Sequence, residues 1–339
     1  MRAIRVTELG GPDVLVPEEV ANPQIGPGQV LVRTAAIGVN FIDTYIRTGT
    51  YPRAVPYVPG AEGTGVVEQV GADVTDVAVG DRVAWAAAEG SYAELVAVDA
   101  DNAVPVPDGI DPAVAASALL QGMTAHYLLE SVYTPQPGEP ILVHAGAGGV
   151  GLVLTQLAKA KGAQVITTVS SDEKEQLSKA AGADRVLRYG PNLATTVREI
   201  TGDGVAAVYD GVGKDTFDES LASLRVRGTL ALFGAASGPV PPVDPQRLNR
   251  AGSVLLTRPS LVHFTRDRAE LRWRAGAIFD AIANGALQIR IGARYPLEQA
   301  AQAHRDLEGR KTTGSIVLLP GPNGATVDGT EPITKEEDS

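Results

Sequence analysis

Glycines in the segment HAGAGGVG, residues 144–151, have the clearest chemical use in this chain. Gly146, Gly148 and Gly151 fit the spacing G-x-G-x-x-G, with an apolar run before them and a periodic Leu/Ala helix after them. Such a turn lets a pyrophosphate approach the backbone without a Cβ in the way, and it aims helix N–H groups at the anion. We therefore expect these three glycines to bind a dinucleotide. No Gly-Lys-Ser/Thr follows, which excludes a Walker-type loop, and the alternative is a glycine-rich turn without a ligand.

The end of the next apolar run, Gln164–Val169, indicates which dinucleotide binds. An NAD site places Asp or Glu there to hold the ribose 2′-hydroxyl. Here Ser170 and Ser171 stand at the tip, and Lys174 follows shortly after. Ser170 and Lys174 suit a 2′-phosphate, through charge-assisted hydrogen bonds of roughly 1.5–3 kcal/mol each. Asp172 is a counter-signal, although an acid also suits the first turn of a helix. The pattern favours NADPH over NADH, with an ordinary exposed helix lysine as the alternative for Lys174.

The elements that must position these residues change in character along the chain. From Met1 to about Leu120, short β-type runs are broken by Gly and Pro, which suggests a barrel or rolled sheet. From about Pro140 to Thr257, short apolar runs alternate with helical segments, which is typical of a buried parallel sheet. Six such runs match the strand count of a complete dinucleotide-binding fold. They are Ile141–Ala145, Gln164–Val169, Arg185–Tyr189, Val205–Asp210, Thr229–Gly234 and Ser253–Thr257.

Three further elements follow the expected parallel sheet. The pattern predicts amphipathic helices around Arg268–Asn284 and Leu297–Glu308, and a strand over Ser315–Leu319. Neither helical tract supports another sheet alone. We therefore expect both tracts to complete the first domain, with the nucleotide domain inserted between its two parts.

Composition excludes several classes of protein. The net charge of −11 repels nucleic acid phosphates and anionic lipid, so neither is an expected partner. The chain has no cysteine, which excludes disulfides, thiolate catalysis and Cys-ligated zinc. No apolar stretch is long enough for a membrane span, and the first residues do not resemble a secretory signal, so the expected location is the cytoplasm. Residues 321–339 are expected to form an acidic, disordered tail.

Six segments together resemble the zinc-independent quinone oxidoreductase, or zeta-crystallin-like, branch of the medium-chain dehydrogenase/reductases. They are Ala35–Pro52, Pro59–Gly71, Gly80–Val83, His144–Leu152, Val208–Leu221 and Thr257–Leu261. The resemblance implies an α/β fold in which a GroES-like β-rich catalytic domain carries an inserted Rossmann-type nucleotide-binding domain with a six-stranded parallel sheet. The expected catalytic domain spans residues 1–122 and 260–320, and the nucleotide domain spans 123–259. The implied activity is metal-free hydride transfer from NADPH to a quinone.

Departures from the zinc-bearing relatives of this branch are informative. Those relatives have Cys where Asn40 stands, and Gly-His-Glu where Gly60-Ala61-Glu62 stands. A catalytic zinc needs three protein ligands, and Glu62 alone would remain here. The four histidines are too scattered for a helix-spaced ligand pair; they are His126, His144, His263 and His304. The sequence therefore predicts a site without a metal.

The resemblance also implies roles for individual residues. Asn40, Asp43 and Tyr45 are expected to border the nicotinamide end of the cleft, where Asn40 would fix the carboxamide or the substrate oxygen and Tyr45 would donate a hydrogen bond to the developing oxyanion. The alternatives are an ordinary tyrosine at Tyr45 and a capping carboxylate at Asp43. The other expected cofactor contacts are Tyr127, Gly149, Val150, Ser170, Lys174 and Tyr189, with Phe233, Gly234, Ala235, Ala236 and Gly314 closing over the nicotinamide side.

Two other functions stay open on the sequence. One is an NADPH-dependent enal, enone or enoyl-thioester reductase on the same fold, because the pocket differs more among such enzymes than the cofactor loop. The other is a non-catalytic NADPH-binding protein, crystallin-like or RNA-binding, although the acidic charge argues against RNA. The resemblance implies a homodimer that pairs through the sheet edge containing Ser253–Thr257.

Overall fold

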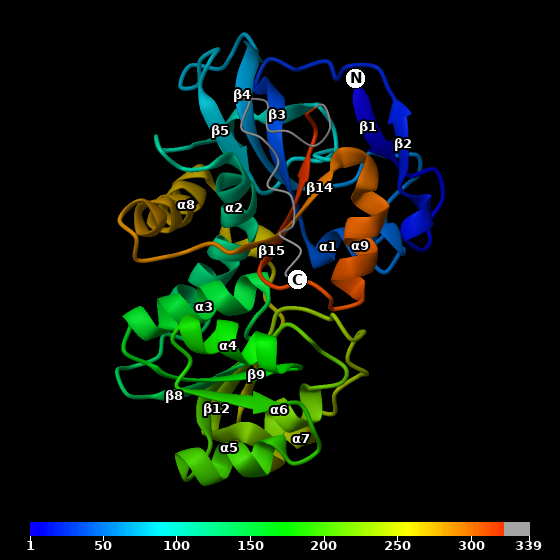
Figure 1. Ribbon diagram of the computed structural model, residues 1–339. Coiled ribbons are helices and arrows are strands. Elements are labelled where there is room, and N and C mark those ends of the chain that lie inside the picture. Colours follow the sequence, from blue (N-terminus) through cyan, green and yellow to red (C-terminus); the bar gives the residue numbers. More distant parts are fainter. Residues whose placement is uncertain (322–339) are drawn as a thin grey trace, which may run out of the picture. The chain divides into compact units, whose positions relative to one another are not determined.

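The change of pattern near residue 120 marks a division of the folded chain. In the computed structural model, which describes residues 1–321, Met1–Leu120 and residues 291–321 form unit 1, and Gln121–Arg290 form unit 2 (Figure 1). The expected acidic tail, apart from its first residue, lies outside the described residues.

The second boundary differs from the expected one, because residues 260–290 belong to unit 2. Helix α8 (Arg268–Ala283) packs so closely on helix α2 (Pro112–Tyr127) that a Cβ on Gly122 would lie 2.8 Å from Ile278 Cγ2. Arg274, which is 1% exposed, lies with its Nη1 3.2 Å from His126 Nδ1. Burial of this face therefore attaches α8 to unit 2, and this corrects the expectation that the helix completes the first domain.

Among the described residues of unit 1, one mixed sheet has the order β14-β15-β3-β4-β5-β7, with β6 also paired to β3. The long strand β3 is central because it pairs antiparallel with β4, β6 and β15. The strands of this sheet are β3 (Gln29–Val39), β4 (Glu62–Val70), β5 (Arg82–Trp85), β6 (Leu95–Asp99), β7 (Val104–Pro105), β14 (Ile291–Pro296) and β15 (Ser315–Leu319). A β-rich unit agrees with the expectation, whereas β14 was not expected.

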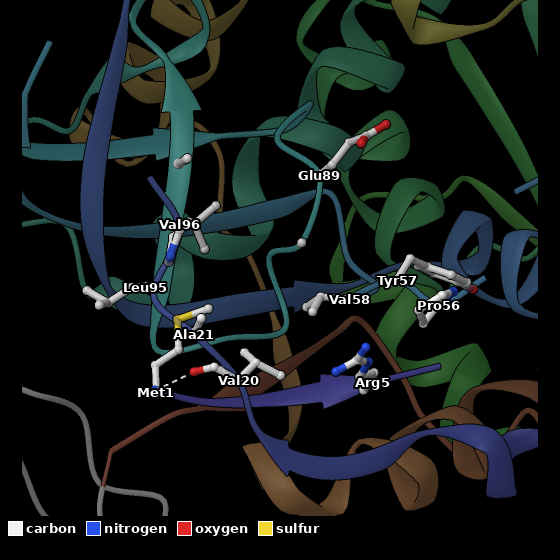
Figure 2. Close-up of a pocket in the computed structure, with 13 residues that line it drawn as sticks. Met1, Arg5, Val20, Ala21, Pro56, Tyr57, Val58, Glu89, Leu95 and Val96 are labelled. Carbon is white, nitrogen blue, oxygen red and sulfur yellow. Dashed lines mark hydrogen bonds between the residues drawn. The ribbon is translucent and has the colours of Figure 1, made fainter. Parts of the chain in front are cut away.

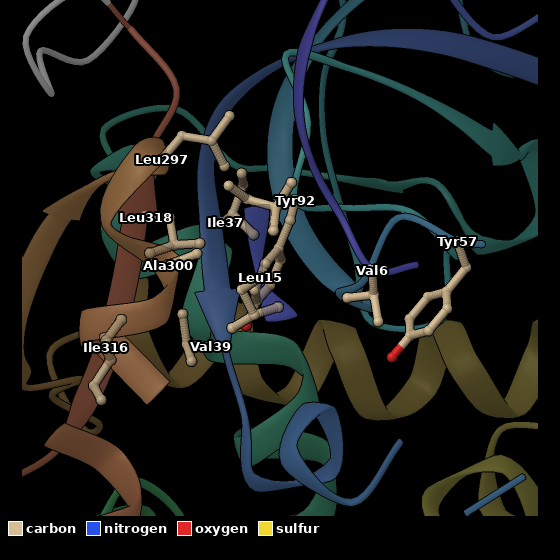
Figure 3. Close-up of a cluster of buried hydrophobic side chains, with 12 residues drawn as sticks. Val6, Leu15, Ile37, Val39, Tyr57, Tyr92, Leu297, Ala300, Ile316 and Leu318 are labelled. Carbon is tan, nitrogen blue, oxygen red and sulfur yellow. The ribbon is translucent and has the colours of Figure 1, made fainter. Parts of the chain in front are cut away.

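Smaller elements complete unit 1. Strands β1 (Arg2–Arg5) and β2 (Val16–Glu19) form an antiparallel pair. The helices are α1 (Phe41–Arg47) and α9 (Ala300–Glu308), with short turns at Pro12–Val14, Ala100–Asn102 and Leu297–Gln299. Figure 3 shows side chains from the N-terminal and C-terminal segments of unit 1 in one cluster. Ile37 and Val39 of β3 lie near Ile316 and Leu318 of β15. This core joins residues that lie far apart in the sequence.

Unit 2 contains a six-stranded parallel sheet in the order β10-β9-β8-β11-β12-β13. Numbered from β8, this order is 3-2-1-4-5-6, which is that of a complete dinucleotide-binding fold. Its strands are β8 (Pro140–Val143), β9 (Gln164–Val169), β10 (Arg185–Arg188), β11 (Val205–Asp210), β12 (Leu224–Leu232) and β13 (Leu255–Thr257). All six expected strands are present, and β12 begins earlier than expected.

Helices connect these strands and cover their apolar side chains. They are α3 (Gly149–Ala160), α4 (Asp172–Ala180), α5 (Leu193–Thr201), α6 (Phe217–Ser223) and α7 (Gln246–Arg250). A π-helical turn at Leu128–Val132 extends α2, and a short turn at Leu261–Phe264 precedes α8. Leu142, Val208 and Leu230 of the sheet pack against Phe217 and Leu221 of α6 in one buried cluster. In residues 1–321, no helix is long and apolar enough to cross a membrane.

Candidate dinucleotide site and active-site residues

The glycine loop lies at the carboxyl end of β8, and its three motif glycines have different surroundings. A Cβ on Gly146 would lie 2.6 Å from Thr167 Cβ, and a Cβ on Gly151 would lie 2.2 Å from the Ala145 carbonyl oxygen. These two glycines therefore permit close packing within the protein. Gly148 differs, because the nearest atom to its Cβ position is the Ala145 carbonyl oxygen at 3.3 Å. Gly148 is the N-cap of α3, so it stands at a helix N-terminus, where N–H groups attract an anion.

The loop begins with a residue in an unfavourable conformation. Ala145 has a φ of 54°, in the left-handed region. Its N–H donates to the Tyr189 hydroxyl at 2.9 Å, and the Tyr189 ring stacks on His144 with centroids 6.0 Å apart. Tyr189 directly follows β10. The structure thus brings this predicted cofactor contact to the glycine loop.

The tip of β9 carries the predicted phosphate ligands. Lys174 Nζ lies 3.4 Å from Ser170 Oγ, and α4 is capped by Ser171, which accepts from the Lys174 N–H. The side chain of Asp172 is 99% exposed and pairs with Arg188, which also donates to Glu175 at 2.8 Å. The carboxylate that argued against NADPH is therefore held by a cation. The Ser170–Lys174 pair fits a 2′-phosphate.

The predicted segment 233–236 lies at the same edge of the parallel sheet. The N–H of Ala236 donates to the Gly211 carbonyl at 3.2 Å, and a Cβ on Gly234 would lie 2.3 Å from that oxygen. Phe233 and Gly234 donate their N–H groups to the Asp210 carbonyl. Segment 233–236 therefore follows β12 alongside the end of β11.

Tyr127 is in a different environment from these residues. It is 2% exposed and stacks on Phe264, with ring centroids 4.5 Å apart and an interplanar angle of 6°. Burial raises the pKa of its hydroxyl. This packing explains why the side chain is buried, and a contact between Tyr127 and the cofactor stays a prediction.

In unit 1, the three predicted catalytic residues lie at the start of α1. Asn40 is its N-cap, and Asp43 completes a capping box by accepting the Asn40 N–H at 2.9 Å. The Asn40 side chain donates from Nδ2 to Glu62 Oε2 at 2.8 Å. Tyr45 is half-buried, with its ring edge-on to Tyr51 at 5.5 Å. The structure therefore brings Asn40 and Asp43 into one buried group, with Tyr45 on the same helix.

Two buried carboxyl groups flank Asn40. Glu62 accepts the Leu120 N–H at 2.8 Å, and burial raises its pKa to about 8. Burial likewise raises the pKa of Asp43 to about 6. Glu62 is 0% exposed and Asp43 is 2% exposed, so both act within the protein interior. In the sequence, Glu62 was noted only because the zinc-bearing relatives also have Glu at this position. Its contact with Asn40 was not predicted.

Asp43 is the end of a longer buried chain that sequence reasoning also missed. Tyr92 donates its hydroxyl proton to Asp43 Oδ2 at 3.0 Å, and the Tyr92 oxygen lies 3.0 Å from His304 Nε2. At the other nitrogen of the His304 ring, Arg47 Nη1 lies 3.1 Å from Nδ1. Arginine only donates, so Nδ1 accepts and Nε2 carries the proton. Burial lowers the pKa of His304 to about 3, with the Arg47 charge adding to the effect.

Gly314 is the remaining predicted cofactor contact. It lies in unit 1, next to β15, with a φ of 63°. Contacts of Asn40, Asp43, Tyr45 and Gly314 with nicotinamide stay predictions. In the described residues, no group of three or more His, Cys, Asp or Glu side chains is arranged to hold a metal ion.

A hollow of about 410 Å³ lies in unit 1 (Figure 2). Its wall is largely apolar, and its charged groups have partners within the protein. The Met1 ammonium donates to the Val20 carbonyl at 2.9 Å, Arg5 pairs with Glu18, and Glu89 pairs with Arg53. We therefore assign no chemistry to this hollow.

Two family descriptions match the chain in the order of its elements. Residues 26–108 match the alcohol dehydrogenase GroES-like domain, and residues 149–277 match the zinc-binding dehydrogenase family. The first match lies in unit 1 and the second in unit 2. The expected two-part α/β architecture is confirmed.

Individual proteins are similar over nearly the whole length. A quinone oxidoreductase of Pseudomonas aeruginosa is 46% identical over 323 residues, covering 94% of this chain and 99% of that protein. A 2-haloacrylate reductase of a Burkholderia species is 43% identical over 325 residues, covering 93% and 98%. A mycobacterial structure complexed with NADPH is 61% identical, with a TM-score of 0.93, covering 94% of this chain and 100% of that one. The chain therefore belongs to the quinone oxidoreductase, or zeta-crystallin-like, branch of the medium-chain dehydrogenase/reductase superfamily.

Proposed function

We propose that this protein is an NADPH-dependent reductase that transfers hydride to quinones without a metal. The carboxyl edge of the unit 2 sheet carries this proposal. There Gly148 caps the N-terminus of α3, and the Ser170–Lys174 pair lies at the tip of β9. Such an edge fits a diphosphate and a 2′-phosphate in a chain that is 46% identical to a quinone oxidoreductase.

The residues of this edge suggest how NADPH is held. The N–H groups of the first turn of α3, including Gly149 and Val150, would bind the diphosphate. Ser170 and Lys174 would bind the 2′-phosphate, and Tyr189 would lie near the adenosine. Segment 233–236 would cover the nicotinamide side. Reduced nicotinamide supplies a hydride when it is bound.

The quinone end of the reaction needs little acid catalysis. A quinone is already electrophilic, and one hydride with one proton converts it to the hydroquinone. The protein must therefore place the two rings at near-attack distance and exclude water. We assign Asn40 to fixing the carboxamide or the substrate oxygen, and Tyr45 to donating a hydrogen bond to the developing oxyanion. Asp43 is buried against the backbone of Asn40, so we assign it to holding Asn40 in place.

Oxidation of NADPH and NADH, followed by loss of absorbance at the reduced-nicotinamide band, tests the proposal. The enzyme is treated with a chelator, and simple quinones are compared with a short panel of enals and enones. Fast NADPH oxidation with quinones, unchanged by the chelator, is the expected result. NADPH binding without turnover of any acceptor would instead favour a non-catalytic protein.

A second candidate function is reduction of an activated carbon–carbon double bond. It is favoured by the 43% identity to a 2-haloacrylate reductase, close to the 46% identity to the quinone oxidoreductase. Both reactions begin with hydride addition to a conjugated carbonyl, so the same cofactor edge serves either. Turnover of enones or 2-haloacrylates without turnover of quinones would establish this second function.

The proposed assembly is a homodimer in the cytoplasm, with no nucleic acid partner. Strand β13 is at the edge of the six-stranded sheet, where Leu255 is 63% exposed. Val226, in the neighbouring strand β12, is 70% exposed. An exposed edge strand with apolar side chains is suited to pairing with a second copy. Titration with RNA at physiological salt tests the alternative of an RNA-binding protein. We expect no binding, because the net charge is −11.

A further inference from the structure

A buried imidazole lies next to the glycine loop, and the proposed reaction gives it no role. His144 directly follows β8 and is 1% exposed. Its Nδ1 lies 2.8 Å from the Thr168 hydroxyl, and its Nε2 lies 2.9 Å from the Ser220 hydroxyl. Ser220 in turn donates to Asp210 Oδ2 at 2.7 Å. The His144 ring therefore links Thr168 of β9 to Ser220 of α6 and, through Ser220, to Asp210 of β11.

The direction of each hydrogen bond follows from the carboxylate at the end of this chain. Asp210 also receives two backbone N–H groups and a threonine hydroxyl, so it acts as an acceptor. Ser220 has one hydroxyl proton, which it gives to Asp210, and its oxygen must then accept from His144 Nε2. Burial lowers the pKa of His144, so the ring is neutral and Nδ1 accepts from the Thr168 hydroxyl.

The residues joined by His144 are those that hold the loop. The Thr168 carbonyl accepts the N–H of Gly146 at 2.9 Å, so Thr168 contacts both His144 and the first motif glycine. The Tyr189 ring stacks on His144, and its hydroxyl accepts the N–H of Ala145. These contacts keep Ala145 at its positive φ of 54°, on which the direction of the loop depends.

We propose that His144 is a positioning residue for the dinucleotide. It acts through Thr168 and Tyr189, which fix the glycine loop, and its ring does not touch the cofactor. The role requires a neutral ring that donates at Nε2 and accepts at Nδ1. This inference rests on the proposed NADPH-binding function, and it adds a residue that the spacing of the glycines does not include.

Three substitutions at this position separate the two hydrogen bonds. In H144N the amide oxygen can take the place of Nδ1 and accept from Thr168, whereas in H144Q the amide nitrogen can take the place of Nε2 and donate to Ser220. H144F keeps a ring for Tyr189 but loses both bonds. We expect the Kd for NADPH to rise about tenfold in H144Q and H144F, and by less in H144N, because one net hydrogen bond is worth about this factor. At saturating NADPH, kcat should stay near that of the wild type.

Tyr209→Phe is the matched control. It removes a partly buried hydrogen bond of unit 2, from the Tyr209 hydroxyl to the Tyr133 carbonyl at 2.8 Å, without removing a side chain that holds the loop. This variant should lower the melting temperature and leave the Kd for NADPH unchanged. If the His144 variants behave in the same way, with lower melting temperatures and an unchanged Kd, His144 is only structural and the proposal fails.

Thr168→Val provides a second test if the His144 variants do not fold. It removes the hydroxyl that donates to Nδ1 and keeps a side chain of similar volume, and it should also raise the Kd for NADPH with little change in kcat. An unchanged Kd in this variant would overturn the proposal. Binding to the wild-type protein is measured by titration with both NADPH and NADH. If neither binds, the proposed function itself fails. If NADH alone binds, the choice of cofactor is wrong, and the same variants test His144 with NADH.

Discussion

Lys174 is the residue on which the choice of cofactor depends. Its ammonium lies 3.4 Å from Ser170 Oγ, while the nearby Asp172 pairs with Arg188. We expect Lys174→Ala to reduce the preference for NADPH over NADH about tenfold, because one charge-assisted hydrogen bond to the 2′-phosphate is lost. The ratio of kcat/KM values for the two cofactors measures this. Lys179→Ala is the control, because Lys179 lies on the same helix and pairs with Glu175. An unchanged preference in Lys174→Ala would contradict the phosphate assignment.

Tyr45 is the predicted hydrogen-bond donor to the substrate. Its ring packs against Tyr51 and Phe41, at 5.5 and 6.3 Å between centroids, and these contacts do not depend on the hydroxyl. We expect Tyr45→Phe to lower kcat about tenfold with quinones, because the hydrogen bond to the developing oxyanion is lost. Steady-state kinetics at saturating NADPH check this expectation, with Tyr51→Phe as the control. Unchanged turnover would remove Tyr45 from the mechanism.

At the scale of elements, the position of Gly148 in the glycine loop predicts an effect of substitution on NADPH binding. Gly148→Ala places its methyl group 3.3 Å from the Ala145 carbonyl oxygen, a tight contact that a shift of a few tenths of an ångström relieves, and the methyl group blocks the approach of a diphosphate. The Kd for NADPH should therefore rise at least tenfold, with a smaller loss of melting temperature than in Gly151→Ala.

Gly151→Ala is the counterpart of Gly148→Ala. Its Cβ would lie 2.2 Å from the Ala145 carbonyl oxygen, so the strand–helix packing must shift, at a cost of about 1–3 kcal/mol of unfolding free energy. Binding titrations and thermal unfolding distinguish the two variants. Equal loss of stability in both would mean that Gly148 also serves only packing.

The chain from Arg47 through His304 and Tyr92 to Asp43 joins α1, α9 and the segment before β6, and it predicts a pH effect. The pKa of His304 falls from 6.5 to about 3 on folding. Between these two pH values the histidine is therefore protonated in the unfolded chain and neutral in the folded protein. The stability that neutral His304 contributes is therefore complete above pH 6.5 and is lost as the pH falls toward 3. Between pH 7 and pH 5 this loss is about 2 kcal/mol.

The variant His304→Gln isolates this contribution. Asp43 and Glu62 act in the opposite direction, because their pKa values are raised to about 6 and about 8, and the folded protein holds their protons more tightly as the pH falls. The difference in unfolding free energy between the wild type and His304→Gln should therefore shrink by about 2 kcal/mol from pH 7 to pH 5. Urea unfolding at each pH measures it.

At the scale of the whole molecule, the exposed edge of unit 2 predicts the assembly. In a symmetric dimer formed by pairing of β13, each Leu255 would lie near its symmetry mate, so Leu255→Glu would place two like charges together. We expect a dimer for the wild type and a monomer for this variant, by size-exclusion chromatography with light scattering. Val79→Glu is the control, because Val79 is 62% exposed and lies in unit 1. A wild-type monomer would remove the dimer from the proposal.

Local pattern was sufficient to predict most elements of the fold. The bounds of β9, β11 and β15 agree with the sequence pattern to the residue, because a short apolar run between turn signals defines a strand locally. The assignment of α8 to unit 2 was not predictable in this way. An amphipathic helix shows that one face is buried, but not which unit buries it.

The sequence by itself determined the glycine loop, the strand–helix alternation and the absence of Cys and His at the zinc positions. Each of these depends on residues a few positions apart, where chain geometry fixes what neighbours can do. Only the tertiary structure decided that Glu62 holds Asn40, that Tyr92 and His304 support Asp43, and that Ser220 orients His144. The partners in these contacts are separated by 22 to 212 residues. Their meeting depends on how sheets and helices pack, and no spacing in the sequence records it.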